Sequence, residues 1–227
     1  MIPTPAWSEP GPPAPWASVE PSRLRGFTLE RVRAAVGGEL DLDARPESQG
    51  ISRASAVLGP VFEEDGETLI VLTRRGATMR SHRSEVSFPG GRVEPGETLV
   101  GAALREAFEE IALDPTSVEI IATLSPLQTF SSQALIHPFV GILPGRPELR
   151  ANPVEVERVF DVALADLLAP GVHHSEVWGI GEVAREMHFF DLAHDIVWGA
   201  TGRLLWELLA RLTGTMPAVG LDAGPLP

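Results

Sequence analysis

The stretch from Gly90 to Leu113 reads GGRVEPGETLVGAALREAFEEIAL and joins a glycine-rich loop to a sequence with helical spacing. Thr98 is a residue type that favours the first, capping position of a helix, and the helix is expected to cover residues 98–111. At 3.6 residues per turn, its apolar residues form one stripe, made of Val100, Ala103, Leu104, Ala107 and Ile111. This stretch therefore predicts an amphipathic helix with one face against a core.

Three glutamates lie on the opposite side of this helix. Glu106, Glu109 and Glu110 have i, i+3 and i+4 spacing, which places their Cβ atoms roughly 5–6 Å apart. Their repulsion weakens the helix, and Arg105 relieves only part of it through Glu109. A divalent cation such as Mg²⁺ compensates, because it prefers carboxylate oxygens. Spacing alone fits a solvated acidic face equally well, but the glycine-rich loop and Glu97 before the helix favour a metal site.

Helices and strands alternate on both sides of this segment. Helices are expected at 27–36, 164–168 and 202–212, and strands at 54–62, 68–73, 118–124, 134–143, 156–162 and 186–190. This mixture around one core predicts an α/β sandwich. It forms one domain at 26–214, between a proline-rich flexible arm at 1–25 and a flexible tail at 215–227.

Composition excludes several classes of protein. The chain of 227 residues is 44% hydrophobic, a globular value, and it has no cysteine, which excludes disulfides, thiolate metal sites and cysteine nucleophiles. A net charge of −13 argues against general nucleic-acid binding. No apolar run approaches the roughly 18 residues of a membrane helix, and the first residues do not resemble a signal peptide. We therefore expect a cytoplasmic protein that binds neither nucleic acid nor membrane.

A basic segment lies directly before the acidic helix. Residues 74–92 contain five arginines and one glutamate, a formal charge of +4, whereas residues 94–110 contain five glutamates and one arginine, a formal charge of −4. Arginine offers planar, forked donors that match phosphate oxygens. A surface cluster that only aids solubility is the alternative, but a basic loop beside a metal-binding helix suits a substrate with several phosphates.

A glycine, four glutamates and their spacing carry a resemblance to a known family. The pattern resembles the Nudix box, a long motif with fixed gaps: Gly91 is followed after five residues by Glu97, and after seven more by the run Arg105 to Leu113. One position departs, since Ala112 stands where the box has glycine at the end of the helix. A left-handed alanine costs about 1 kcal/mol there, but it carries no ligand atom. We expect altered helix termination with unchanged chemistry.

The resemblance implies a Nudix-type α/β/α sandwich with a mixed β-sheet and a metal-dependent diphosphatase activity. It implies that Glu106, Glu109 and Glu110 hold Mg²⁺ or Mn²⁺, with the carbonyl of Gly91 completing the metal shell. Bound metal ions polarise a diphosphate and lower the pKa of an attacking water.

The same resemblance implies the supporting roles. Arg105 and Glu97 form an ion pair that orients the metal ligands. The base that activates water is Glu109, Glu110 or a glutamate further along the chain, for which Glu155 is a minor candidate. Coupled carboxylates around metal ions do not titrate separately, so the sequence does not choose between them.

Residues 72–91 also resemble an additional motif of coenzyme A diphosphatases. The residues in register with that motif are Leu72, Thr73, Arg75, Arg80, Phe88, Pro89, Gly90 and Gly91. His82 and Glu85 suit it too. Two positions depart: Gly76 replaces the usual Ser or Ala, and Ser84 replaces a glycine that allows close approach of the backbone to a ligand.

This second resemblance implies hydrolysis of coenzyme A or acyl-CoA by a monomer or homodimer. Its implied substrate-binding residues are Arg75, Arg80, His82, Ser84 and Phe88. Two alternatives stay open. The same chemistry could act on ADP-ribose, a dinucleotide or another nucleoside diphosphate derivative, since a shared fold does not fix the ligand. A non-catalytic nucleotide-binding regulator is less favoured, because all three metal glutamates are intact.

Overall fold

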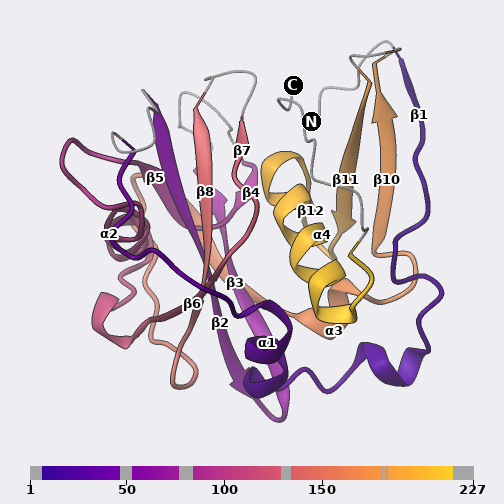
Figure 1. Ribbon diagram of the computed structural model, residues 1–227, viewed down its shortest axis with the longest axis horizontal. Coiled ribbons are helices and arrows are strands. Elements are labelled where there is room, and N and C mark those ends of the chain that lie inside the picture. The colour runs from indigo at the N-terminus through magenta and orange to yellow at the C-terminus, as the bar shows by residue number, and fades with distance from the viewer. Residues whose placement is uncertain are drawn as a thin grey trace.

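Layers of secondary structure follow one another across the molecule in Figure 1, a computed structural model that describes residues 7–46, 53–76, 84–128, 134–179, 181 and 184–216. The helices are α1 (Leu29–Val36), α2 (Leu99–Ile111), α3 (Leu164–Leu167) and α4 (Gly199–Thr213), with short 3₁₀ turns at Pro21–Leu24 and Pro115–Ser117. The strands are β1 (Ser8–Pro10), β2 (Ala54–Glu64), β3 (Glu67–Arg75), β4 (Val86–Ser87), β5 (Gly90–Arg92), β6 (Glu119–Thr123), β7 (Leu127–Gln128), β8 (Leu135–Ile142), β9 (Val156–Ala163), β10 (His173–Trp178), β11 (Arg185–Asp191) and β12 (Ile196–Val197).

A mixed sheet forms the centre of the fold. Its main path runs β4-β3-β2-β8-β6, while β5 pairs with β2, β7 with β8 and β9 with β3. β2 and β8 are parallel, and the other pairings in this sheet are antiparallel. The expected α/β fold with a mixed sheet is therefore confirmed.

The hairpin between β2 and β3 follows directly from its turn residues. Glu64 pairs with Glu67, which leaves a two-residue loop. Asp65 and Gly66 both have positive φ, 53° and 79°. A two-residue turn of this kind matches the twist of the paired strands and favours Asp-Gly. Asp65 and Gly66 therefore form the turn that fixes the register of the two strands.

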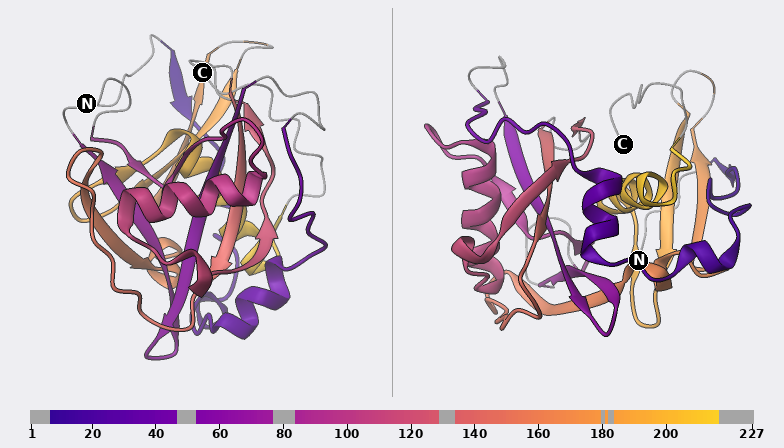
Figure 2. Two further views of the ribbon diagram at one scale, coloured as in Figure 1. Left: turned by 90° about the vertical axis from the view of Figure 1, so that its left-hand side faces the viewer. Right: turned by 60° about the horizontal axis from the view of Figure 1, so that its bottom comes forward.

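Helices cover both faces of the mixed sheet. Figure 2 shows α2 on one side and α1 and α4 on the other, with the sheet of β10 and β11 beyond α4. The apolar stripe of α2 packs on Ala56, Leu58 and Phe139 in one core cluster. Leu204, Leu205 and Leu208 of α4 belong to a larger cluster on the opposite face of the sheet. Among the described residues, no helix is long and apolar enough to cross a membrane.

The second sheet has the order β1-β10-β11-β12 and includes part of the proline-rich segment. Ser8–Pro10 pairs with β10, Ser175 Oγ donates to the carbonyl of Pro12 at 2.8 Å, and Trp16 is buried at 3% exposure. An edge strand has a neighbouring strand on one side only. Proline is tolerated there, because its missing N–H can face the open side, where no hydrogen bond between strands is lost. The proline content indicates a flexible arm, whereas residues 7–25 pack along this sheet.

The helix that the sequence places at residues 98–111 is α2, capped as expected at its start. Thr98 Oγ1 accepts a hydrogen bond from the backbone N–H of Gly101 at 2.9 Å. At its other end Ala112 is left-handed, with φ 57° and ψ 29°, and its N–H bonds the carbonyls of Ala107 and Phe108. The helix therefore ends in the conformation that glycine favours, although the residue is alanine. The expected change in helix termination is wrong, because Ala112 accepts the left-handed conformation despite its Cβ.

We predict that Ala112→Gly stabilises the protein. The substitution removes the Cβ penalty of a left-handed residue, and the free energy of unfolding should rise by about 0.5–1 kcal/mol. Chemical denaturation monitored by circular dichroism measures this change. Ala34→Gly is the matched control, because Ala34 is exposed within α1 and glycine costs about 1 kcal/mol at such a position. A loss of stability in both variants would contradict the prediction.

Two histidines meet between the strands of the second sheet. His173 Nε2 and His188 Nδ1 are 3.3 Å apart, and the ring of His188 stacks on Trp206 of α4 with centroids 4.7 Å apart. Burial lowers the pKa of His173 to about 4. Burial, His173 and Arg203 lower the pKa of His188, although Glu186 Oε1 lies 3.7 Å from its Nδ1. Both rings are therefore held neutral in the folded protein.

This pair predicts a loss of stability in mild acid. Both folded pKa values lie below the value of about 6.5 in an unfolded chain, so unfolding takes up protons. The free energy of unfolding should therefore fall below pH 6.5, by up to about 1.4 kcal/mol per pH unit for each histidine. Urea denaturation between pH 7.5 and 4.5 should show a shallower fall for His188→Gln. The exposed His194 supplies the control, since His194→Gln should keep the wild-type slope; equal slopes in all three proteins would contradict the prediction.

Candidate active site

Strand β5 brings the glycine-rich loop alongside the acidic face of α2. Gly90 and Gly91 pair with Val57 and Ala56 of β2, and the N–H of Gly90 donates to Glu110 Oε2 at 3.2 Å. A Cβ added to Gly91 would lie 2.5 Å from the carboxyl carbon of Glu106. That carboxyl group could move aside, but a Cβ added to Gly90 would lie 2.4 Å from the carbonyl oxygen of Ala56, so only glycine fits at position 90.

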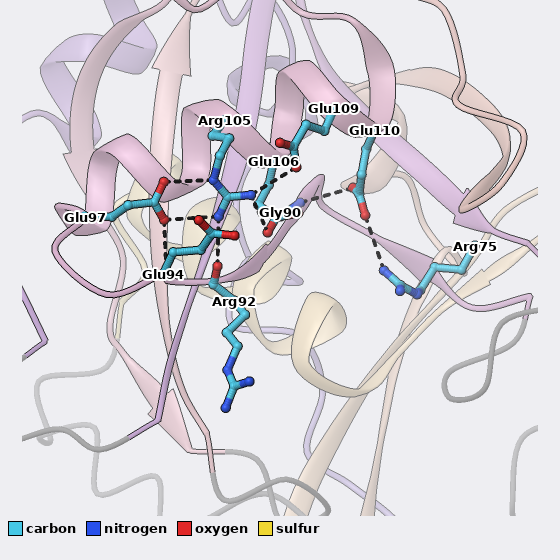
Figure 3. Close-up of polar contacts among 9 residues, drawn as sticks. All are labelled: Arg75, Gly90, Arg92, Glu94, Glu97, Arg105, Glu106, Glu109 and Glu110. Carbon is cyan, nitrogen blue, oxygen red and sulfur yellow. Dashed lines mark hydrogen bonds and ion pairs between the residues drawn. The ribbon is translucent and has the colours of Figure 1, made fainter.

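Arg105 is the centre of a hydrogen-bond network on α2 (Figure 3). Its Nε and Nη2 donate to the two carboxylate oxygens of Glu97 at 2.8 and 3.1 Å. Its Nη1 donates to Glu106 at 2.9 Å and to Glu109 at 3.0 Å, and Nη2 also reaches the carbonyl of Arg92. The hydrogen bonds from Arg105 lower the pKa of Glu97, which keeps that carboxylate charged. The ion pair implied by the sequence is present.

Glu110 is the most buried carboxylate of the group, with a side chain 3% exposed. Its Oε1 lies 3.5 Å from Arg75 Nη1, at the end of β3. Burial raises the pKa of Glu110 to about 7; the charges of Glu106 and Glu155 act in the same direction, while Gly90 and Arg75 oppose them. Gly90 and Arg75 therefore offset the burial of this carboxylate only in part.

Asn152 fixes the end of α2 against the segment that leads into β9. Its backbone N–H donates to the carbonyl of Glu110 at 2.8 Å, and its side-chain amide donates to the carbonyl of Glu109 at 3.3 Å. The carbonyl of Glu155 accepts from Gly76 N–H at 2.8 Å, just after Arg75. These bonds bring Glu155 close enough to raise the pKa of Glu106 and Glu110. The motifs contain no signal for this role of Asn152.

The carboxylates fit a divalent cation chemically, but they point apart. Glu110 faces Arg75 and Gly90, whereas Glu106 and Glu109 face Arg105 (Figure 3). Within the described ranges, no three His, Asp or Glu side chains stand together in a group that could hold a metal ion. The fit comes from hard oxygen donors on one helix face and from the uncompensated burial of Glu110. Side-chain rotation is needed to bring these oxygens together.

Ser84 lies in a turn directly beside β3. It has φ 57°, the left-handed conformation in which glycine is favoured, and the carbonyl of the next residue, Glu85, accepts from Arg75 N–H at 2.9 Å. Ser84 therefore adopts a conformation that glycine adopts more readily, because its Cβ carries a conformational cost.

Phe88, another predicted substrate residue, does not lie on the α2 face. Phe88 is 4% exposed and packs in the core cluster on the opposite face of the sheet. Its position supports the loop between β4 and β5 without presenting the ring to a ligand. Arg80 and His82 lie outside the described residues.

Comparison with known proteins agrees with this geometry. The model of the NUDIX domain matches residues 52–178. A protein named Uncharacterized Nudix hydrolase NudL from Photorhabdus laumondii is 36% identical over 163 residues, covering 71% of this chain and 86% of the relative. A protein of the same name from Citrobacter koseri is 36% identical over 174 residues, covering 74% and 88%.

The fold is similar to that of solved Nudix structures. A MutT/nudix family protein from Enterococcus faecalis aligns with a TM-score of 0.51 at 16% identity, covering 78% of this chain and 66% of the other. Nudix hydrolases use divalent metal ions such as Mg²⁺ or Mn²⁺. The domain match, the two relatives and the glutamate helix agree: the chain belongs to the Nudix hydrolase family and is a hydrolase that acts on pyrophosphate bonds.

Proposed function

We propose that this Nudix hydrolase cleaves the diphosphate bond of coenzyme A or an acyl-CoA. The products are (acyl-)4′-phosphopantetheine and adenosine 3′,5′-bisphosphate. The observation that carries the proposal is the approach of Arg75 to Glu110 at 3.5 Å. Arg75 belongs to the segment at 72–91 that resembles the coenzyme A diphosphatase motif, so the substrate-linked segment and the glutamate helix meet at one point.

Each side chain of the site has a part in this reaction. Mg²⁺ or Mn²⁺ would be held by Glu106, Glu109, Glu110 and the carbonyl of Gly91. The bound metal would neutralise charge on the phosphates and lower the pKa of the attacking water. Arg75 offers forked donors to a phosphate oxygen. Glu109 or Glu110 accepts the proton of the attacking water, since both lie on the face that the phosphates approach.

The supporting residues set the geometry in which that reaction occurs. Arg105 holds Glu97 through two hydrogen bonds and thereby fixes α2 against the loop before it. Ser84 departs from the motif, but its left-handed backbone is a conformation that glycine also adopts, so the departure is compatible with the coenzyme A assignment. A substrate with phosphates on both sides of the scissile bond suits a basic segment next to an acidic helix.

A substrate panel tests the proposal. The purified full chain is assayed with Mn²⁺ against coenzyme A, acetyl-CoA, ADP-ribose and NADH, and products are identified by mass. We expect the highest kcat/KM for coenzyme A or acetyl-CoA and no turnover after chelation of the metal. A higher kcat/KM for ADP-ribose or NADH would reassign the substrate, and nucleotide binding without turnover in any divalent metal would indicate a regulator.

A further inference from the structure

Asp195, in the turn between β11 and β12, is a buried carboxylate shared by two arginines. Its side chain is 3% exposed. Arg74 Nη1 donates to one of its oxygens and Arg158 Nη2 donates to the other. Asp195 belongs to the second sheet, whereas both arginines belong to the mixed sheet. This carboxylate therefore links the two sheets.

The two arginines need this carboxylate. Arg74 and Arg158 are direct cross-strand partners on β3 and β9, and like charges placed in this way destabilise a sheet. Arg158 is 42% exposed and can turn toward solvent, with its guanidinium also lying over the ring of Phe160 at 4.6 Å. Arg74 is 28% exposed and has one further acid, Glu157, at 3.3 Å. Its position therefore depends more strongly on Asp195.

Arg74 directly precedes Arg75, the arginine proposed to bind a phosphate of the substrate. The pairing of β3 with β9 shifts register between Arg74 and Arg75, and the extra residue, Glu157, lies on β9. Along β3 itself, successive side chains point to opposite faces of the sheet. Arg74 consequently faces Asp195, while Arg75 faces Glu110 on α2.

We infer that Asp195 is a positioning residue for Arg75, acting through Arg74. The ion pair holds Arg74, on one face of β3, against the second sheet. The alternation of side chains along the strand then directs Arg75 to the opposite face, toward Glu110. This inference rests on the proposed function only for the role of Arg75 toward a phosphate. The coupling between Asp195 and the end of β3 is independent of any substrate.

Arg74→Gln and Arg158→Gln form a matched pair of tests. Each removes one of the two arginines and leaves Asp195 paired with the other, so neither variant leaves a buried charge alone. Only Arg74→Gln should lower kcat/KM, on the order of 10- to 100-fold, because a small displacement of a positioned group has effects of that size. Asp195→Asn should reproduce Arg74→Gln. Asp191→Asn should have no effect, because Asp191 is an exposed acid at the end of β11.

A double substitution separates positioning from general stability. In an Arg75→Ala background, Arg74→Gln should cause little further loss of kcat/KM, because both changes remove the same contact. A purely structural role predicts independent, multiplicative losses and a matching fall in melting temperature. Multiplicative losses would overturn the inference.

Amide hydrogen exchange tests the coupling without substrate or metal. The N–H groups of Arg75 and Gly76 are bonded to the carbonyls of Glu85 and Glu155 at 2.9 and 2.8 Å. Arg74→Gln should accelerate exchange at these two amides by about 10-fold, and Arg158→Gln should not. Unchanged protection in Arg74→Gln would overturn the inference. If the wild-type chain hydrolysed no diphosphate, the proposed function would fail and exchange alone would decide the coupling.

Discussion

Replacing Glu110 with glutamine should reduce kcat for diphosphate hydrolysis by about 10²–10⁴-fold while leaving the fold intact. Glutamine keeps the shape of the side chain but removes an anionic metal ligand and a candidate base. Steady-state assays with saturating Mg²⁺ or Mn²⁺ measure the change. Turnover close to the wild-type value would refute the role assigned to the glutamates of α2.

The same substitution should not lower the stability of the protein. Glu110 is buried with its pKa raised to about 7, so its charged form is poorly accommodated in the protein without metal. A neutral amide removes that cost, and the melting temperature of metal-free Glu110→Gln should equal or exceed the wild-type value at pH 8. Active sites commonly lose stability to keep such groups. Glu94→Gln is the control, since Glu94 is exposed and should change neither activity nor melting temperature.

Replacing Arg105 with alanine should lower activity and stability together. The guanidinium donates to Glu97, Glu106 and Glu109, and its removal leaves three neighbouring carboxylates without their shared cation. The free energy of unfolding should fall by about 2 kcal/mol, the scale of hydrogen bonds to charged groups. kcat should fall on the order of 10²-fold, because the metal ligands lose their orientation.

Two further variants check that the geometry of Arg105 matters. Arg105→Lys keeps the charge but lacks the fork that bridges both oxygens of Glu97, so it should restore stability only in part. Arg33→Ala is the control, because Arg33 also binds both oxygens of a glutamate, Glu119, but lies exposed at 47%. Exposed pairs contribute little, so its loss should change neither property strongly. Full recovery in Arg105→Lys would contradict the orienting role.

The sequence carries local features reliably, because these depend on neighbours along the chain. Helix α2 follows from its apolar period and from Thr98, which caps it as expected. The turn at Asp65-Gly66 follows from residues that tolerate positive φ. The departure at Ala112 was recognisable from the spacing of the box, and the residue indeed takes the left-handed conformation of the glycine it replaces.

Other features depend on contacts between distant segments and were missed. The proline-rich segment has no periodic pattern, so its pairing with β10 had no signal in the sequence. β10 itself contains His173, His174 and Glu176, and this polar content concealed a strand that pairs with β1 and β11. Phe88 appeared in a substrate motif, but packing against the sheet draws a large apolar ring into the core.

The sequence by itself determined the reaction class, since the box spacing along one helix sets which glutamates share a face, and helical geometry is local. Only the tertiary structure decided which partners those glutamates meet. Glu110 approaches Arg75, which lies 35 positions away in the sequence, and Asp195 binds Arg74, which lies 121 positions away. The burial of Glu110 likewise depends on how these separate elements pack. Such contacts arise when separate elements pack to bury apolar surface, and no period along the chain encodes them.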